Sequence, residues 1–282
     1  MIETSNLTKD RILTYLSEGR RFDNRKLDEY RELTIELGIS KKAEGSAKVK
    51  LGKTEVWVGV KMEIGEPYPD SPDKGNLTVT AELIPLSHGK YEYGPPRFEA
   101  IEVGRLVDRG IRESKYINFE KLCIQEGEKV WTICIDIYSI NDDGNLIDAA
   151  FIGALAALRD AKIPNYDEKE DKIDYEKEAK QKVPLFEENM PINFTIFQAG
   201  NVIFLDPTLE EENSSHGKLT LAFIPTNPIR ICSMQKGDTL QVSPEKFAEM
   251  LEFAEKKHKT FFPEINKTIE EAIKAKEKKK DK

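Results

Sequence analysis

Apolar residues recur at three- and four-residue intervals in residues 98–114, which follow the breaker pair Pro95-Pro96. This spacing predicts a helix that buries one face and exposes the other. Residues 146–161 are apolar on nearly every side and are followed by Pro164. We therefore expect this second segment to form a helix that is buried in the centre of the molecule.

Two further helices are predicted near the ends of the chain. The first begins at Leu7-Thr8, with Thr8 as its cap, and stops at Gly19. The second begins at Ser243-Pro244, a capping residue followed by proline at the first helical position. Pro263 is expected to kink or restart this helix. The lysine-rich residues 274–282 are expected to form a frayed, solubilising tail.

Runs of β-branched and alternating residues, with turns at Gly52-Lys53 and Ala199-Gly200-Asn201, predict strands in both parts of the chain. The order of strands and helices predicts an α+β fold with two halves of similar plan. The expected strands are residues 46–51, 54–64, 77–83, 121–125, 130–140, 192–198, 202–205, 219–224 and 229–234. The expected segments are an N-terminal helix (1–18), a first half (19–161), a charged connecting segment (162–190), a second half (191–263), and a helix end with its tail (264–282).

The composition narrows the class of protein. The chain has 282 residues, a net charge of −8 and 33% charged residues. Its longest apolar run, residues 149–158, is too short to cross a bilayer, and its first residues lack the apolar core of a secretion signal. We therefore expect a cytoplasmic protein with no membrane partner. Cys123, Cys134 and Cys232 lack paired spacing, which predicts reduced thiols in the core. The three histidines are far apart in the sequence, so we expect neither a bound metal ion nor a cofactor.

Three arginines stand out in this acidic chain. At about 100° per residue, Arg105, Arg109 and Arg112 share an arc of roughly 60° on the polar side of the predicted helix 98–114. Guanidinium groups in a row are suited to successive phosphates, which favours a polyanion-binding face. The neighbouring acids Asp108 and Glu113 support a second interpretation, in which these charges form a salt-bridged, solvated face.

Several motifs, taken in order, resemble the RNase PH superfamily. They are the segments 19–31 and 45–56, then Gly94-Pro95-Pro96 before the arginine helix, Leu205-Asp206-Pro207, and the acidic run Glu210-Glu211-Glu212. The resemblance extends from about residue 15 to about residue 260, and it is strongest to the non-catalytic RNase PH-like subunits of archaeal exosomes.

This resemblance implies a fold, partners and a function. The fold is the RNase PH-like fold, with two duplicated halves of the ribosomal protein S5 domain 2-like type. The family implies a hexameric ring, formed as a trimer of heterodimers with a catalytic RNase PH-like subunit. It also implies a central channel for single-stranded RNA and cap proteins that carry S1 or KH domains. Arg105 and Arg109 match arginines that bind RNA phosphates in the family, and Arg112 lies on the same face.

The first catalytic motif of the family is altered in this chain. Catalytic relatives place a Gly-Gly-Thr-Arg-Thr run before the buried helix, where this chain has Gly144-Asn145-Leu146-Ile147-Asp148. Asp148 would place a negative charge at a helix N-terminus that could otherwise bind phosphate. We expect Asn145 to cap the helix and Asp148 to satisfy its first turn. Asp142 and Asp143 would further repel phosphate.

The second catalytic position is altered as well. Catalytic relatives carry an aspartate shortly after the Glu-Glu segment, and counting from Glu210-Glu211 without gaps places Lys218 there. A lysine neither binds a divalent metal nor acts as a carboxylic acid, and the neighbouring Gly217 and His216 are not carboxylates. The sequence thus favours an inactive subunit that structures the partner's active site and contributes to RNA binding for 3′-to-5′ phosphorolytic degradation.

Two alternatives stay open at this stage. One is an active phosphorolytic 3′-to-5′ exoribonuclease that uses Asp206 or an acid of the 210–212 run, although we expect these acids to be exposed to solvent. The other is an RNA-binding module that acts alone, without a ring.

Overall fold

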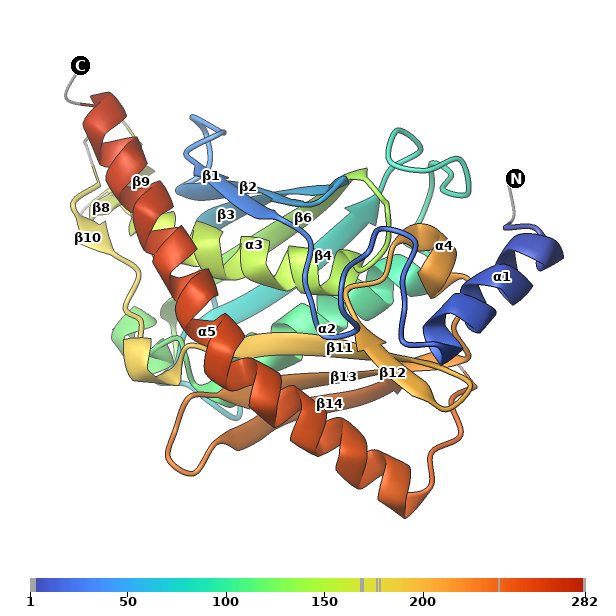
Figure 1. Cartoon of the computed structure of the whole chain (residues 1–282). Coiled ribbons are helices and arrows are strands. Elements are labelled where there is room, and N and C mark those ends of the chain that lie inside the picture. The colour runs from blue at the N-terminus through green and yellow to red at the C-terminus, as the bar shows by residue number, and fades with distance from the viewer. Residues whose placement is uncertain (1–3, 168–169, 176, 178, 238, 281–282) are drawn as a thin grey trace.

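Two β-sheets enclose a pair of central helices, as Figure 1 shows for a computed structural model of the chain. The structure describes residues 4–167, 170–175, 177, 179–237 and 239–280. The central helices are α2 (Phe98–Ser114) and α3 (Leu146–Asp160). Both ranges agree with the helices expected from the hydrophobic pattern, and the α+β fold class is confirmed.

The first sheet has six strands. Its order is β1-β2-β3-β6-β4, with β5 paired to β6; β4 runs parallel to β6, and the other pairs are antiparallel. The strands are β1 (Leu33–Leu37), β2 (Gly45–Leu51), β3 (Thr54–Gly65), β4 (Asn76–Leu83), β5 (Cys123–Gln125) and β6 (Lys129–Asn141). Strand β1 is missing from the sequence prediction, although its alternation of apolar and polar residues is typical of a half-buried strand.

The second sheet has four antiparallel strands in the order β12-β11-β13-β14. Its strands are β11 (Ile192–Ala199), β12 (Val202–Leu205), β13 (Gly217–Ile224) and β14 (Arg230–Gly237). Helix α3 contacts β2 and β3 on one side and β11 on the other, whereas α2 contacts β4 and β14. The approach of α3 to the first sheet is close, because a Cβ atom at Gly153 would lie 2.7 Å from Val58 Cγ2.

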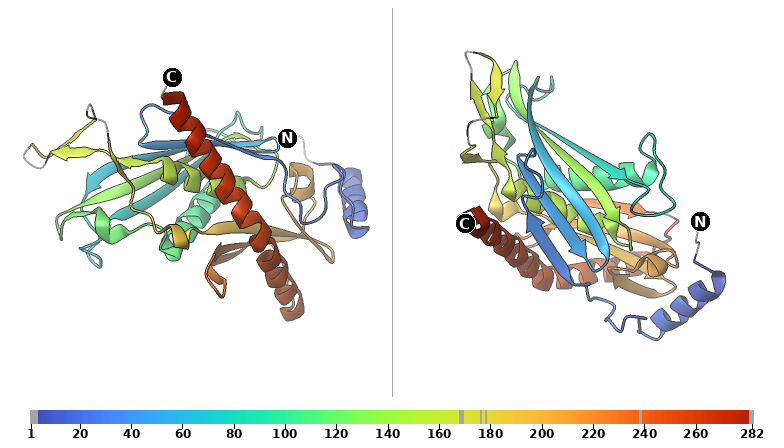
Figure 2. Two further views of the ribbon diagram at one scale, coloured as in Figure 1. Left: turned by 60° about the vertical axis from the view of Figure 1, so that its left-hand side comes forward. Right: turned by 90° about the horizontal axis from the view of Figure 1, so that it is seen from above.

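The remaining elements lie around this core. They are α1 (Asn6–Ser17), η1 (Phe119–Leu122), η2 (Glu187–Asn189), α4 (Leu209–Glu212), α5 (Pro244–Lys280), and the short strands β7 (Lys162–Ile163), β8 (Asn165–Asp167), β9 (Lys172–Asp174) and β10 (Gln181–Lys182). The charged connecting segment thus contains two small antiparallel pairs, β10 with β7 and β8 with β9. Figure 2 shows that the β8–β9 hairpin projects from the body of the molecule. Residues 168–169, 176 and 178 of this segment lie outside the described residues.

The predictions for the terminal helices need correction. Ser5 rather than Thr8 caps α1, because its side chain accepts a hydrogen bond from the backbone N–H of Thr8. Of the two outcomes expected at Pro263, a kink or a restart, the restart is wrong, because α5 continues through the proline as one helix with Phe261 and Ile265 buried in the core.

The lysine-rich end of the chain also differs from its prediction. It is helical to Lys280, and Lys276 forms an ion pair with Asp160 at the end of α3. Residues 281–282 are outside the described part. Within the described part, no helix is both long and apolar enough to span a membrane.

Candidate functional site

The arginine face of α2 divides into two parts. Arg105 and Arg109 are exposed, whereas the opposite side of the helix is buried through residues such as Val107 and Ile111. Arg109 Nη1 lies 3.5 Å from Gln235 Oε1, which is a weak contact. Arg105 makes no hydrogen bond or ion pair to any residue that the structure describes. Two guanidinium groups are therefore available on this face for a ligand.

Arg112 is in a different environment, because its guanidinium already has partners. Its Nη2 lies 2.6 Å from Asp108 Oδ1, one helical turn earlier, and donates a hydrogen bond of 2.9 Å to the carbonyl of Leu77 on β4. The salt-bridged interpretation of this face thus holds for Arg112, which joins α2 to the edge of the first sheet.

A small cavity of about 60 Å³ lies where the N-terminus of α3 meets α2 and β13. Lys218 from β13 and Glu102 from α2 form an ion pair across it, with Lys218 Nζ 2.9 Å from Glu102 Oε2. Their side chains are only 12% and 11% exposed. Lys218 is the residue that the resemblance places at the position of a catalytic aspartate, and it is held by a carboxylate.

Two other acids of this cavity also have partners. Asp142 accepts a hydrogen bond of 2.6 Å from the hydroxyl of Tyr91 and lies 3.4 Å from Lys90 Nζ. Glu212 accepts a hydrogen bond of 2.8 Å from the backbone N–H of Asn145, the residue before α3. Burial raises the pKa of Glu212. The backbone donor at the start of α3 is thus occupied by a side chain of the protein itself.

Asn145 occupies the N-cap position of α3, as expected, but its side chain makes no capping hydrogen bond. Asn145 has a left-handed backbone, with φ 54°, and its side chain donates to Asp206 Oδ1 at 2.9 Å instead of capping α3. Asp148 is buried and accepts hydrogen bonds from Tyr30, Asn193 and Thr195, including 2.8 Å from Thr195 Oγ1. Burial raises the pKa of Asp148 to about 6, against the effect of these donors. Asp148 thus joins α3 to β11 rather than satisfying its own helix.

The acids of the Leu205-Asp206-Pro207 and 210–212 motifs are not all exposed to solvent, contrary to expectation. Asp206 is completely buried and accepts hydrogen bonds from Arg31 Nη2 at 2.7 Å and from Arg25 Nη1 at 2.9 Å. Glu211 is buried too, and it accepts a hydrogen bond of 2.9 Å from Arg21 Nε. These three arginines come from the N-terminal segment that contributes to the family resemblance. They attach this segment to the second half of the chain.

The cysteines and histidines form no site. All three cysteines are free and half-buried rather than fully inside the core. His258 is buried against the rings of Phe262 and Phe194, and burial lowers its pKa to about 4. Among the described residues, no group of His, Cys, Asp and Glu is arranged to hold a metal ion.

The sequence alone pointed to Lys218 and Asn145 but not to the residues that contact them in the folded protein. Lys218 was identified, but its partner Glu102 is 116 positions away, and Glu212 reaches Asn145 across 67 positions. No local pattern marks such pairs, because they form only when the two halves pack together. Lys90 and Tyr91, which complete the cavity, were likewise not identified.

Comparison with known proteins supports the resemblance. Residues 29–164 match the model of domain 1 of the 3′ exoribonuclease family, and residues 189–257 match its domain 2. The protein named "Exosome complex component Rrp42" from Methanocella arvoryzae is 42% identical over 90% of this chain and 93% of its own length. The protein of the same name from Pyrococcus horikoshii is also 42% identical, over 96% of each chain.

A solved structure agrees with these relatives. A chain of the structure described as the Archaeoglobus fulgidus exosome with RNA bound to the active site has a TM-score of 0.80 and 38% identity, and the match covers 97% of this chain and 98% of that chain. The matches in sequence and in structure both extend over nearly the whole molecule. The chain therefore belongs to the RNase PH family of 3′ exoribonuclease-like proteins.

Proposed function

We propose that this chain is a non-catalytic subunit of an archaeal exosome, the complex that degrades RNA from its 3′ end by phosphorolysis. It pairs with a catalytic RNase PH-like subunit in a hexameric ring, structures that partner's active site and contributes to RNA binding. S1- or KH-domain cap proteins are the further partners expected for such a ring. The relatives named Rrp42 and the archaeal exosome structure support this assignment.

The observation that carries the proposal is the charge of the cavity at the start of α3. Four carboxylates line it, those of Glu99, Glu102, Asp142 and Glu212, against only Lys90 and Lys218. Both lysines already pair with acids of the cavity. Inorganic phosphate carries one or two negative charges at neutral pH, so binding here would place it among carboxylates with no unpaired cation to compensate. The cavity therefore opposes the binding of the phosphorolytic co-substrate.

The group that would handle the proton or hold a metal ion is also replaced. Lys218 carries a positive charge where the family places an aspartate, and its ion pair with Glu102 fixes it within the cavity. Glu102 itself is occupied by this ion pair and is not free to act as a base. An enzyme that uses this cavity would have to break the pair before either group could take part in the reaction.

The exposed guanidinium groups of Arg105 and Arg109 support a role in RNA binding. They lie on a helix whose opposite face is packed in the core, so the backbone that presents them is held in place. Arginine suits phosphate because its planar donors can bind two oxygens at once. We assign RNA contact to these two residues and a mainly structural role to Arg112.

The test is phosphorolysis by the purified full-length chain, alone and after co-expression with the catalytic homologue. The chain alone should release no nucleoside diphosphate from single-stranded RNA in the presence of phosphate, whereas the complex should be active. The mass of the complex should correspond to three copies of each subunit. Product formation by the chain alone would contradict the non-catalytic assignment. A stable monomer that does not bind the catalytic homologue would favour the alternative, an RNA-binding module that acts without a ring.

A further inference from the structure

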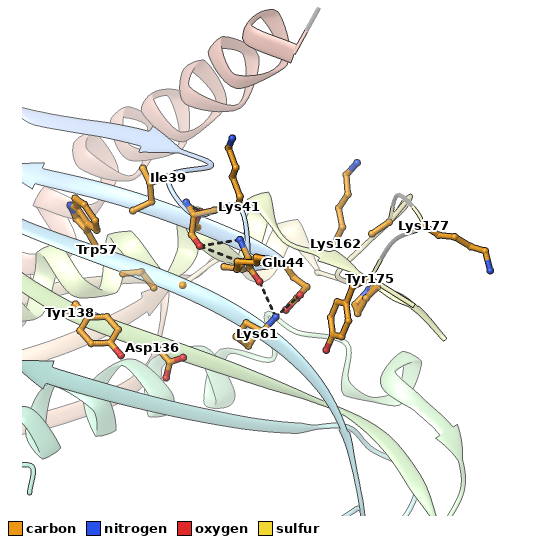
Figure 3. Close-up of a pocket in the computed structure, with 18 of the residues that line it drawn as sticks. Ile39, Lys41, Glu44, Trp57, Lys61, Asp136, Tyr138, Lys162, Tyr175 and Lys177 are labelled. Carbon is orange, nitrogen blue, oxygen red and sulfur yellow. Dashed lines mark hydrogen bonds and ion pairs between the residues drawn. The ribbon is translucent and has the colours of Figure 1, made fainter. Parts of the chain in front are cut away.

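A second hollow, which we call the groove, shares no lining residue with the cavity at α3. It has a volume of about 870 Å³, and its floor is the open face of the first sheet, at strands β2, β3 and β6 (Figure 3). Its walls come from residues 39–44, which precede β2, and from six described residues of the connecting segment: Lys162, Pro164, Asp174, Tyr175, Lys177 and Ala179. Helices α2 and α3 pack on the other face of this sheet, where alternate residues such as Val56, Val58 and Val60 are buried.

The groove is basic in a chain that is acidic overall. Five lysines line it, against Glu44, Asp136 and Asp174, so the lining has a net charge of about +2 while the whole chain has −8. The acids are engaged: Glu44 pairs with Lys61 at 2.7 Å, and Asp136 accepts a hydrogen bond from Thr80. Asp174 pairs with Lys177. The lysines of the groove are Lys41, Lys42, Lys61, Lys162 and Lys177.

Two of these lysines are placed to bind an external anion. Lys41 and Lys42 are exposed at the rim, and neither ammonium group forms an ion pair with a described residue. Adjacent unpaired cations beside a groove whose acids have internal partners favour a ligand that carries several negative charges.

Aromatic side chains form part of the floor and one wall. Trp57 on β3 and Tyr138 on β6 are directly opposite each other in the sheet, and they are 42% and 38% exposed. Tyr175 faces the groove from the connecting segment, with Lys61 Nζ 5.2 Å from its ring centre. Exposed rings beside lysines provide surfaces on which flat groups can stack.

Gly59 gives the floor an unusual feature. It lies in the middle of β3 on the open face, between Trp57 and Lys61, where a glycine weakens a strand. Neither packing nor backbone geometry requires glycine here, because an added Cβ would come no closer than 3.9 Å to Ala43 Cβ and the residue does not have a positive φ. A bare backbone at this point lets a ligand approach the sheet closely.

We propose that this groove binds a segment of single-stranded RNA, with bases stacked on Trp57, Tyr138 or Tyr175 and phosphates bound by Lys41 and Lys42. The inference rests on the proposed function, and it adds a second RNA contact on the face of the sheet opposite to α2. A basic groove with aromatic rings is the usual arrangement for binding single strands. An added peptide strand is disfavoured, because it would need an unpaired sheet edge, and β2, β3 and β6 each pair on both sides.

The test uses the full-length chain in complex with the catalytic homologue and a fluorescent oligoadenylate RNA. The variant Lys41→Glu with Lys42→Glu should weaken binding about tenfold at low salt and lower the salt slope by about 1.4, since each phosphate contact on a single strand contributes about 0.7. The control Lys256→Glu with Lys259→Glu makes the same charge change on exposed lysines of α5 and should have little effect. Equal binding by both double variants would overturn the proposal.

A second variant tests the shape of the groove. Gly59→Val should weaken RNA binding while leaving the melting temperature unchanged or higher, because valine suits a strand and its Cβ would make only an ordinary contact, 3.9 Å from Ala43 Cβ. Photocrosslinks from RNA should map to peptides with Trp57, Tyr138 or Tyr175. If the Lys41/Lys42 variant instead fails to associate with the catalytic homologue, the groove is a protein interface and the proposal is wrong. If Arg105→Glu with Arg109→Glu weakens binding but the groove variants do not, the proposed function stands without this second site.

Discussion

Lys218 Nζ lies 2.9 Å from Glu102 Oε2 in the cavity at the start of α3. Breaking this pair should destabilise the protein, because a nearly buried charge would lose its partner. We expect Lys218→Met to lower the free energy of unfolding by about 3 kcal/mol, the lower end of the range for buried ion pairs. Urea denaturation at neutral pH measures this change.

The matched control removes both charges. The double variant Lys218→Met with Glu102→Leu should recover most of the lost stability, because the carboxylate of Glu102 is no longer left without its partner. If the single and double variants are equally unstable, the loss comes from packing rather than from an unpaired carboxylate. Neither variant should gain phosphorolytic activity.

The exposed arginines of α2 should control RNA affinity in the assembled complex. Arg105→Glu with Arg109→Glu should weaken the binding of single-stranded RNA and reduce its salt slope by about 1.4, because two phosphate contacts are lost. Fluorescence anisotropy at several salt concentrations gives both quantities.

Arg112 provides the comparison on the same helix. Because its guanidinium is held by Asp108 and by the carbonyl of Leu77, Arg112→Gln should leave the salt slope nearly unchanged. A drop in slope for Arg112→Gln as large as for the double variant would show that this face is not divided as described.

Asp206 should be among the residues most sensitive to substitution. Its carboxylate is buried and receives hydrogen bonds from Arg25, Arg31 and Asn145, so Asp206→Asn removes the buried counter-charge that the two guanidinium groups share. We expect a loss of about 3–5 kcal/mol in the free energy of unfolding. Asp23, which pairs with Arg25 near the surface, is the control, and Asp23→Asn should cost less than about 1 kcal/mol. If Asp206→Asn and Asp23→Asn lower the free energy of unfolding by similar amounts, the larger effect expected from the burial of Asp206 is contradicted.

His258 should make stability depend on pH. Burial lowers the pKa of His258 to about 4, so the folded protein binds this proton less readily than the unfolded chain. Its contribution is therefore present above the unfolded pKa of about 6.5 and is lost as the pH falls toward 4, by about 3 kcal/mol in total. His258→Phe should remove this part of the acid sensitivity, as measured by urea denaturation at pH 7 and pH 4.5. If the free energy of unfolding falls equally between pH 7 and pH 4.5 in the original chain and in the His258→Phe variant, His258 is not the source of this acid sensitivity.

Local patterns predicted the helices and strands in which buried positions recur at a regular interval along the chain. The range of α2 and the hairpin turns at Gly52 and Gly200 follow from periodicity and turn residues alone. Strand β1 could have been found in the same way, from the alternation of Leu33, Ile35 and Leu37 with polar residues.

Long-range contacts explain what could not be predicted. The burial of Asp206 depends on arginines about 180 positions earlier in the chain, and the ion pair of Lys218 depends on a helix in the other half. Pro263 is a helix breaker by local rules, yet buried neighbours such as Ile265 keep α5 continuous. In each case the packing of distant segments outweighs the local preference.

Helix α5 contacts β1, β11 and α3, so a segment that is synthesised after both halves covers parts of each. Until it is synthesised, apolar side chains such as Ile265 and Ile269 are missing from the core, and the surfaces that they cover on earlier segments remain open to water. The nascent chain therefore cannot complete its fold one half at a time, because both halves pack against α5 (Pro244–Lys280). Loss of α5, by early termination or proteolysis, would therefore expose the core of both halves to water.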